Sequence, residues 1–371
     1  MLNPTPRFAL RALVLGLACV MTSAAAIAGP ERGGTLNYAY ASGPGTLDPF
    51  VSSSLVELEV IHHLFESLVA MDGKYNTKPM IASKVDVSPD SKTFTFTLRN
   101  GIKFHNGKEL SSADVLASFE RYRKVSPNAK ALEEVEAMEA RRPDTFVMRL
   151  SKPHAVFLDV LKGPVYPMVI LPAEQKDKPP RGIDVIGTGP FQLGEWVKDS
   201  HLVLKRFDGY SANTSAPGPD GLAGRRTAYL DAVRYRFIPE ANARIAAIQT
   251  GDADVVADIP PDLSKRLEGR SELQPVRIFP FCMQVYVLNT QQGLTKNPLI
   301  RQAINAVADV DDIAAAMGRV SQRNHSLVYS TSPYYQGDAM KPYYDQKSPA
   351  KAKELLKQAG YKGEQIVLQT N

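Results

Sequence analysis

The chain contains little cysteine. Its 371 residues include two, Cys19 and Cys282, and Cys19 lies in an N-terminal apolar segment. Because a lone thiol cannot form an internal disulfide, we expect the chain to be stabilised by an ordinary packed core. Cys282 is expected to be a buried, unreactive thiol. The length is ample for such a core and indicates roughly two domains.

The chain also lacks a strong charge of one sign. It has 44 lysines and arginines against 39 aspartates and glutamates, a net charge of +5, and removal of residues 1–28 with their two arginines leaves +3. No block rich in lysine and arginine is present, nor a basic stripe interleaved with aromatic residues. This composition argues against a dedicated nucleic-acid-binding protein, and no nucleic acid partner is expected.

Motifs for phosphate binding are missing. The segment IGTGPFQLGEWV (186–197) has two closely spaced glycines, but it lacks the lysine and hydroxyl of a P-loop and the third glycine of a dinucleotide fold. The segment GIKFHNGKE (101–109) has glutamate where a P-loop needs serine or threonine. We therefore expect no nucleotide site in either segment.

Residues for catalysis or metal binding are sparse. His62 and His63 are adjacent on a predicted helix, so their side chains point about 100° apart and cannot hold one ion side by side. The segment SPAK (348–351) has the S-x-x-K spacing of penicillin-recognising enzymes, but Ser348 as a helix N-cap explains it better. The sequence has no G-x-S-x-G. We expect no catalytic set, no metal site and no cofactor.

The longest apolar run lies at the N-terminus. MLNPTPRFALRALVLGLACVMTSAAAIAGP contains two arginines, an apolar core and an A-x-A site at 26–28, the pattern of a secretory signal peptide over residues 1–28. The run is too short, and its end too rich in alanine and serine, to predict a membrane-spanning helix. Gly16, three residues before Cys19, disfavours lipid attachment there. The sequence thus predicts an exported protein.

The rest of the chain alternates between strand and helix patterns, which indicates a mixed α/β protein in more than one lobe. Ser54 and Glu57 have capping-box spacing at the start of the first helix. Helices are predicted at 53–72, 111–124, 240–251, 297–318 (one helix or a pair) and 348–361. Strands are predicted at 34–42, within 92–108, and at 143–153, 201–207, 232–239, 279–290 and from 364 onward.

Six segments follow one another along the chain in an order that resembles a known family. They are GGTLNYAYASGPGTLDP (33–49), SPDSKTFTFTLRNGIKFHNGKELSSADVLASFERY (88–122), IGTGPFQLGEWVKDSHLVLKRFDGY (186–210), YLDAVRYRFIPEANARIAAIQTGDADVVADIPP (229–261), VYVLNTQQGLTKNPLIRQAINAVADVDDI (285–313) and SPAKAKELLKQAGY (348–361). Together they resemble the family 5 extracellular solute-binding proteins, the peptide- and nickel-binding proteins of ABC importers. The collinear segments cover nearly the whole chain after residue 28. The resemblance implies that 186–190 form a bend where the chain re-enters the first lobe, so that Gly187 and Gly189 serve backbone geometry. The alternative is that Thr188 or Gly189 also lines a ligand cleft.

The resemblance implies a two-lobed periplasmic binding protein of type II-like fold, whose lobes close around a ligand by hinge motion. Lobe 1 would combine 29–46 with 173–278, and a subdomain of 47–172 would be inserted in it. Lobe 2 would start near residue 279, and 279–371 would be its first part. The family's chains normally run further, so we expect lobe 2 to be truncated here. The carboxylate and the arginine that bind peptide termini in the family would then lie beyond residue 371.

The resemblance also implies a ligand site on the faces between the lobes. Gln284 and Tyr286 share one face of the strand predicted at 279–290, because side chains two positions apart point the same way. The alternative for such strand residues is a core role, and Met283 more often fills space than contacts a ligand. The candidate ligand-binding residues are Ser42, Gly43 and Leu47 in the loop after the first strand, and Phe281, Cys282, Met283, Gln284 and Tyr286.

The expected function is that of a periplasmic receptor. It would capture di- or oligopeptides, act as a monomer, and deliver them to an inner-membrane ABC permease. One alternative is the same role for another solute, such as a nickel complex, an opine or an oligosaccharide. Another is a secreted enzyme on a two-lobed scaffold, against which the lack of a recognisable nucleophile–base set argues.

We predict that the exported protein begins at Gly29. Signal peptidase is expected to cut after Ala28, because small residues occupy both recognition positions of the A-x-A site. Intact-mass analysis of a periplasmic extract measures this directly. A protein that keeps Met1, or one that carries lipid on Cys19, would contradict the prediction.

Overall fold

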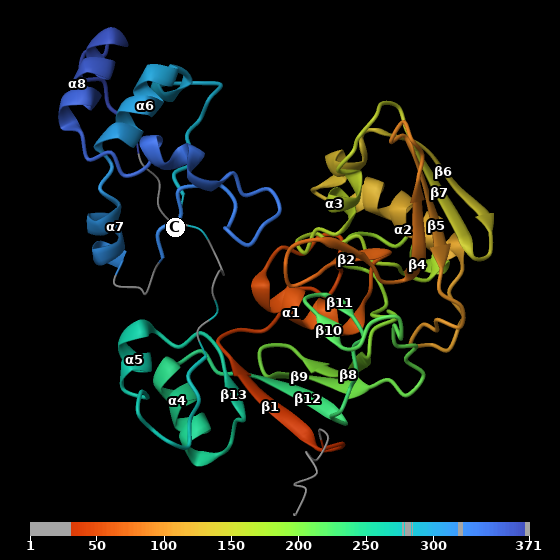
Figure 1. The fold of residues 1–371 in the computed structure, drawn as a ribbon. Helices are drawn as coiled ribbons and strands as arrows, with labels where there is room; N and C mark the ends of the chain where they lie inside the picture. Colours follow the sequence, from red (N-terminus) through yellow and green to blue (C-terminus); the bar gives the residue numbers. More distant parts are fainter. Residues whose placement is uncertain (1–30, 277, 279–282, 284, 318–321, 368–371) are drawn as a thin grey trace, which may run out of the picture.

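The structure is a computed structural model that describes residues 31–276, 278, 283, 285–317 and 322–367. Its first sheet has five strands in the order β13-β1-β12-β9-β8 and lies at the bottom of Figure 1. β1 is parallel to β12 and β13, whereas β12, β9 and β8 are antiparallel neighbours. The strands are β1 (Thr35–Tyr40), β8 (Phe191–Val197), β9 (His201–Arg206), β12 (Ala232–Phe237) and β13 (Val255–Val256).

Helices lie on both faces of this sheet. Successive side chains of a strand point to opposite faces, so each strand can pack against a helix on either side. Tyr40 of β1 belongs to the main core, as do Val60 and Ile61 of α1 (Leu55–Leu64). Ala39 points to the other face and packs with Ala247 of α4 (Ala241–Thr250). Two short sheets lie nearby, formed by β2 (Val69–Met71) with β3 (Thr77–Pro79) and by β10 (Pro219–Asp220) with β11 (Ala223–Gly224).

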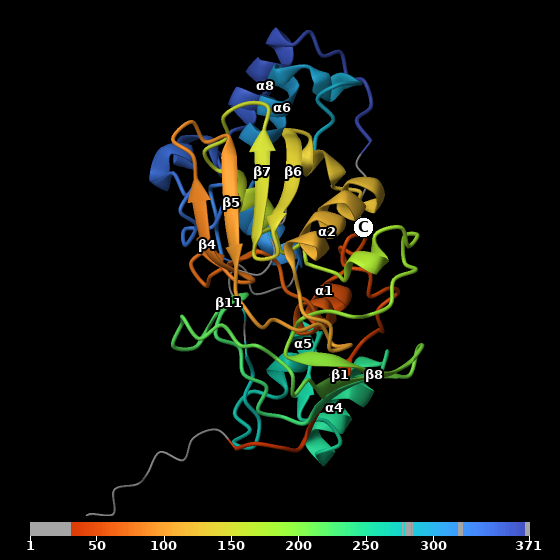
Figure 2. The same cartoon turned by 90° about the vertical axis from the view of Figure 1, so that its right-hand side faces the viewer.

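A second sheet, of four antiparallel strands, comes entirely from residues 82–150. Figure 2 shows it standing above the first sheet, with α2 alongside. The rings of Phe119 in α2 and Phe146 in β7 stack with centroids 5.7 Å apart, and the ring of Phe157 in α3 packs on that of Phe94. The elements are β4 (Ala82–Val87), β5 (Thr93–Leu98), β6 (Val135–Arg142), β7 (Thr145–Leu150), α2 (Ser112–Val125), α3 (Phe157–Leu161), η1 (Ala129–Leu132) and η2 (Ala173–Gln175).

The last third of the described chain consists of helices and turns. In Figure 1, α6, α7 and α8 lie at the upper left, apart from both sheets, and α6 packs on α8 through Ala303, Ala306 and Ala352. Between residues 257 and 367, the described residues form no strand. The elements are α5 (Pro261–Lys265), η3 (Leu294–Lys296), α6 (Pro298–Val307), α7 (Val310–Met317), η4 (Gly337–Tyr343) and α8 (Pro349–Gln358).

Several local predictions are confirmed. The segment 297–318 forms a pair of helices, α6 and α7. The side chain of Ser348 accepts a hydrogen bond from the amide of Lys351 as the N-cap of α8. Gly251, the last residue of the helix predicted at 240–251, ends α4 in the left-handed conformation, with φ of 79°.

Two predictions of strands are wrong over the described residues. Residues 283 and 285–289 have no regular secondary structure, although a strand was predicted at 279–290, and residues 364–367 are also not a strand. A strand forms only as part of a hydrogen-bonded ladder, and no described segment pairs with either stretch. Val285 and Tyr286 are each 57% exposed, so the alternation expected of a half-buried strand is absent as well.

The first helix is shorter than predicted and begins differently. It ends at Leu64 rather than near residue 72, and residues 69–71 form β2. The predicted capping box of Ser54 and Glu57 is also wrong. The carboxylate of Glu57 instead accepts hydrogen bonds from the amides of Gly45 and Thr46, at 3.0 and 3.1 Å. A tertiary contact with the loop after β1 thus replaces the local cap.

Residues 186–190 pack directly against the end of α1, which explains their glycines. The amide of Gly189 donates to the carbonyl of Leu64 at 2.9 Å. A Cβ atom on Gly187 would lie 2.0 Å from that carbonyl oxygen, and one on Gly189 would lie 2.3 Å from the carbonyl oxygen of His63. Both glycines therefore permit a close approach of two chain segments, and their structural interpretation is confirmed.

We predict that Gly189→Ala lowers the free energy of unfolding by about 1–3 kcal/mol, because the added methyl group forces two backbone segments apart. Gly218→Ala is the matched control, since a Cβ there meets no atom within 4 Å. The control should change stability by no more than about 0.5 kcal/mol. Denaturant unfolding measures both. Equal stability of the two variants would show that the contact tolerates a side chain.

Candidate ligand-binding site

The carboxyl ends of the parallel strands mark the candidate site. β1, β12 and β13 run in one direction, so the segments that follow them meet at the same edge of the first sheet. In open α/β sheets, ligands bind outside this edge. The chain leaves β13 at this edge through residues 257–260 and continues into α5 and on towards α6. The candidate edge is therefore also the place where the chain leaves the first sheet for the helical part of the protein.

Two carboxylates fix the loop that follows β1. Glu57 accepts from the amides of Gly45 and Thr46, as described above. Asp48 accepts from both terminal nitrogens of Arg121 in α2, at 3.0 and 2.6 Å, and from the amide of Arg181 at 2.9 Å. The side chains of Asp48 and Arg121 are fully buried. The loop backbone is thus held in place independently of a ligand.

The structure places the predicted residues of this loop in different environments. Ser42 is exposed at the edge. Gly43 follows it, and a Cβ atom there would lie 2.7 Å from the ring of Phe237 at the end of β12. Leu47 is 2% exposed and belongs to the main core, so it offers packing rather than a surface for a ligand. For Ser42 and Gly43, contact with a ligand stays a prediction.

The predicted residues of the later segment are described only in part. Met283 is half-buried and Tyr286 is exposed, and no described contact joins either of them to the loop after β1. Phe281, Cys282 and Gln284 lie outside the described residues. The ligand-binding role of this segment therefore stays a prediction.

Three tyrosines gather on one face of the sheet at the candidate edge. Tyr38 of β1 lies opposite Tyr235 of β12, and their ring centroids are 5.2 Å apart. Tyr40, the last residue of β1, makes an edge-on contact with Tyr38 at 5.9 Å. Tyr40 is 8% exposed and Tyr235 is 1% exposed. Sequence reasoning missed this group, because only the register of β1 on β12 brings Tyr38 beside Tyr235.

Two carboxylates complete what we call the tyrosine–carboxylate cluster, formed by Tyr38, Tyr40, Glu59, Tyr235 and Asp258. The half-buried Glu59 of α1 lies beside Tyr38, and Asp258 is exposed. Burial raises the pKa of Glu59, the neighbouring Tyr38 hydroxyl lowers it in part, and the nearby charge of Asp258 raises it further. Burial and the same two carboxylates raise the pKa of Tyr40 to about 12. Within the described chain, neither carboxylate has an ion-pair partner.

Arg244 fixes the chain just beyond the cluster. Its guanidinium is 3% exposed and donates to the carbonyls of Ile238 and Pro239 after β12, at 2.7 and 2.8 Å. It also donates to the carbonyls of Ala257 and Asp258 after β13, at 3.3 and 2.7 Å. One buried side chain thereby holds together the segments that leave β12 and β13, the strands on either side of β1.

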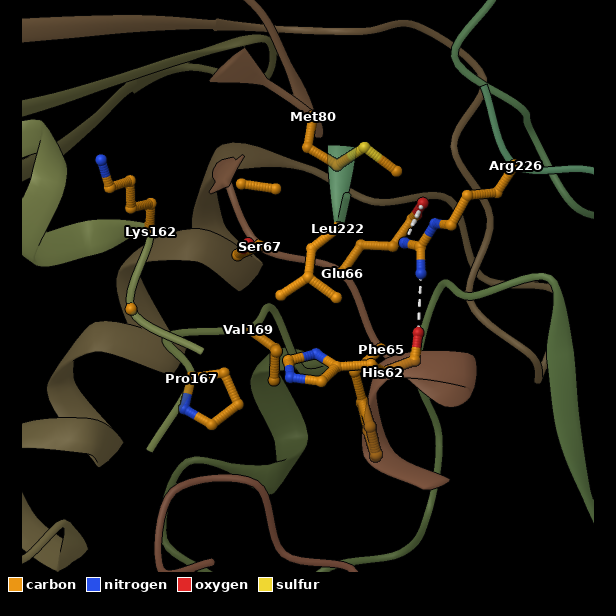
Figure 3. A pocket seen from close by; sticks show the side chains of 12 residues that line it. His62, Phe65, Glu66, Ser67, Met80, Lys162, Pro167, Val169, Leu222 and Arg226 are labelled. Carbon is orange, nitrogen blue, oxygen red and sulfur yellow. Dashed lines mark hydrogen bonds and ion pairs between the residues drawn. The ribbon is translucent and has the colours of Figure 1, made fainter. Parts of the chain in front are cut away.

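A small cavity near the end of α1 is too small to be the ligand site. Figure 3 shows it between His62, Glu66 and Arg226, with apolar side chains around it. Its volume is about 20 Å³, room for one water molecule. Glu66 accepts hydrogen bonds from Thr188, Tyr210 and Arg226, at 3.0, 2.8 and 2.9 Å, so its carboxylate is already satisfied.

The two histidines of α1 are packed against neighbouring parts of the protein. Burial, and then the charge of Arg226, lower the pKa of His62 to about 4, so its ring is neutral near pH 7. His63 makes an edge-on contact with the ring of Phe191. Among the described residues, no three histidine, cysteine, aspartate or glutamate side chains are grouped so as to hold a metal ion. The described helices also include none long and apolar enough to span a bilayer.

The chain belongs to the bacterial extracellular solute-binding proteins of family 5, whose family model matches residues 76–370. Among curated proteins it is similar to the glutathione-binding protein GsiB of Escherichia coli K12. The two are 28% identical over 354 residues, which cover 94% of this chain and 65% of GsiB. The chain thus spans about two thirds of the length of the curated relatives it matches.

Two solved structures share the fold. One is the periplasmic binding protein DppA of Helicobacter pylori in complex with the peptide STSA, with 29% identity, a TM-score of 0.67, and coverage of 89% of this chain and 67% of DppA. The other is AgaA of A. tumefaciens R10 in complex with agropinic acid, with 29% identity, a TM-score of 0.68, and coverage of 88% and 65%. The mixed α/β architecture is therefore that of the two-lobed periplasmic binding proteins.

We predict that Asp48→Asn lowers the free energy of unfolding by about 3–5 kcal/mol, because it leaves the buried Arg121 guanidinium without a charged partner. Asp86→Asn is the control. Asp86 also forms an ion pair, with Lys84, but both side chains are exposed. Its loss should cost no more than about 1 kcal/mol. If denaturant unfolding gives the two variants similar stabilities, the buried pair does not hold the loop as argued.

Proposed function

We propose that this chain forms part of a periplasmic receptor that captures a small peptide and delivers it to an inner-membrane ABC permease. The observation that carries the proposal is the family match over residues 76–370. The geometry supports it, because the loop after β1 and the segments after β12 and β13 are fixed before a ligand binds. A preorganised edge loses little conformational freedom on binding, which favours affinity.

Peptides are the ligand class that the compared proteins favour. GsiB is a glutathione-binding protein, and the DppA structure holds the peptide STSA. The tyrosines of the candidate edge suit such ligands, since a tyrosine combines an apolar ring with a hydroxyl that can donate or accept. The exposed Ser42 and the half-buried Gly43 would offer further amide and carbonyl groups to a peptide main chain.

A second candidate is an opine, with the same receptor role. The specific observation is the AgaA structure, which holds agropinic acid and is as similar to this chain as DppA is. Peptides and opines share carboxylate and amine groups on a small skeleton. The identity of the ligand therefore has to come from direct binding measurements.

Binding without turnover is the other part of the proposal. The family and the compared structures are binding proteins. In a two-lobed receptor, ligand stabilises the closed arrangement only through its higher affinity for that arrangement. The receptor should therefore become more compact when it binds, and should release the ligand chemically unchanged. We propose that it does so as a monomer.

We predict that the full-length receptor binds glutathione or a short peptide, becomes more compact, and leaves the peptide intact. Calorimetry with glutathione, Ala-Ala-Ala and agropinic acid identifies the ligand class. Small-angle scattering with and without the bound compound measures compaction, and mass spectrometry of the recovered ligand tests for hydrolysis. Cleavage of a peptide, or binding of none of these compounds, would overturn the proposal.

A matched pair of variants tests whether Tyr286, in the segment predicted at 279–290, contacts the ligand. We predict that Tyr286→Ala weakens binding about tenfold, as expected when an aromatic side chain contacts the ligand. Tyr343→Ala is the control, because Tyr343 is 59% exposed against 57% for Tyr286, and it lies in η4. The control should bind like the unchanged protein. Equal affinity in both variants would remove Tyr286 from the site.

A further inference from the structure

The tyrosine–carboxylate cluster has an unbalanced charge. Glu59 and Asp258 bring two carboxylates to the edge of the sheet, and no lysine, arginine or histidine of the described chain pairs with either. Glu59 is half-buried and Asp258 is exposed, whereas the fully buried carboxylates of Asp48 and Glu66 have cationic partners in Arg121 and Arg226. The cluster thus lacks a cationic side chain of the kind that pairs with Asp48 and with Glu66.

The cluster also holds polar groups without a partner. Tyr40 and Tyr235 are each more than nine-tenths buried, and neither hydroxyl has a hydrogen-bond partner among the described residues. Both tyrosines lie close enough to Glu59 for its charge to affect them. Neither hydroxyl oxygen is among the fully buried side-chain atoms of the described chain that lack a partner, so both remain accessible to another molecule. Two accessible hydroxyls beside a carboxylate without a cationic partner therefore indicate a place for a polar, positively charged group.

An organic cation fits this arrangement better than a metal ion. A primary ammonium has three N–H donors and no acceptor, which suits two carboxylates and the oxygen atoms of tyrosines. The faces of aromatic rings attract such a cation as well. Divalent metal sites usually need three or more protein ligands of the carboxylate, imidazole or thiolate type, and the described residues offer no such group.

We propose that the tyrosine–carboxylate cluster is a subsite for an ammonium or guanidinium group of the ligand. This inference rests on the proposed function in so far as the edge of the first sheet is the ligand-binding edge. Glu59, beside Tyr38, accepts from the cation; the exposed Asp258 adds a second carboxylate from the segment after β13, and Arg244 positions Asp258 through its carbonyl. The receptor then selects ligands with a basic group.

The first experiment tests the cluster itself with a simple probe. Thermal unfolding of the full-length protein is followed with n-butylammonium chloride, with n-butanol, and with sodium chloride at the same ionic strength. We expect butylammonium alone to raise the Tm in a concentration-dependent manner. Glu59→Gln keeps the shape of the side chain and removes its charge, and it should abolish this rise. Glu136→Gln, at an exposed position of β6, should keep it.

The second experiment tests selectivity among ligands. Calorimetry compares Ala-Lys-Ala with Ala-norleucine-Ala, which has nearly the same shape and no side-chain charge. We expect the lysine peptide to bind about tenfold more tightly, a difference typical of a cation on aromatic and acidic groups. Glu59→Gln and Asp258→Asn should each reduce this preference, whereas Glu136→Gln should leave it intact.

The two experiments separate this inference from the proposed function. If butylammonium raises the Tm in a Glu59-dependent manner but neither peptide binds, the peptide receptor is wrong and the cation subsite stands. If both peptides bind equally and butylammonium acts no more than sodium chloride, the receptor stands and the subsite is wrong. A butylammonium effect that persists in Glu59→Gln would also overturn the subsite.

Discussion

The buried carboxylate of Asp48 holds together three stretches of chain that are distant in sequence. It lies in the loop that leaves β1, it binds the guanidinium of Arg121 in α2, and it accepts from the amide of Arg181 on the path back to β8. A charge removed from water costs several kcal/mol unless good geometry and further hydrogen bonds offset that cost. Here the bidentate pair and the amide supply that compensation. The position of the candidate edge thus depends on an interaction within the protein interior that does not itself meet a ligand.

Acidic residues on or near α1 differ in whether an arginine neutralises them. The fully buried Asp48 and Glu66 are each paired with an arginine, and both connect segments that are distant in sequence. Glu57 and Glu59 of α1 are half-buried and have no cationic partner within the described chain. Glu57 accepts hydrogen bonds from two amides of the loop after β1, whereas Glu59 lies among the tyrosines. The charges of Asp48, Glu66 and Glu57 thus serve the fold, and that of Glu59 is available to another molecule.

The sequence predicted those helices and strands that are marked by residues close together in the chain. The residues SSAD at the start of α2 form a capping box of Ser111 and Asp114, and alternation in TFTFTL marks β5. Glu57 was assigned to the wrong partner because a carboxylate at capping distance can also reach a loop that only tertiary packing brings near. The tyrosine–carboxylate cluster could not be predicted for the same reason, since its members come from two strands, a helix and the irregular segment after β13. The strand expected at 279–290 failed because sequence alternation predicts a strand only where another strand is present to pair with it.

The pairing of β1 also decides when the first sheet can form during synthesis. Hydrogen bonds join Gly34 to Asp231, 197 positions later, and Asn37 to Asp254, 217 positions later. The strands β4 to β7, by contrast, all lie within 82–150 and have their partners nearby in the chain. At ribosomal rates of about 5–20 residues per second, β1 waits on the order of ten seconds or more for its neighbours. The inserted sheet can therefore be complete while the first strand of the protein is still an unpaired edge that has to be kept from other chains.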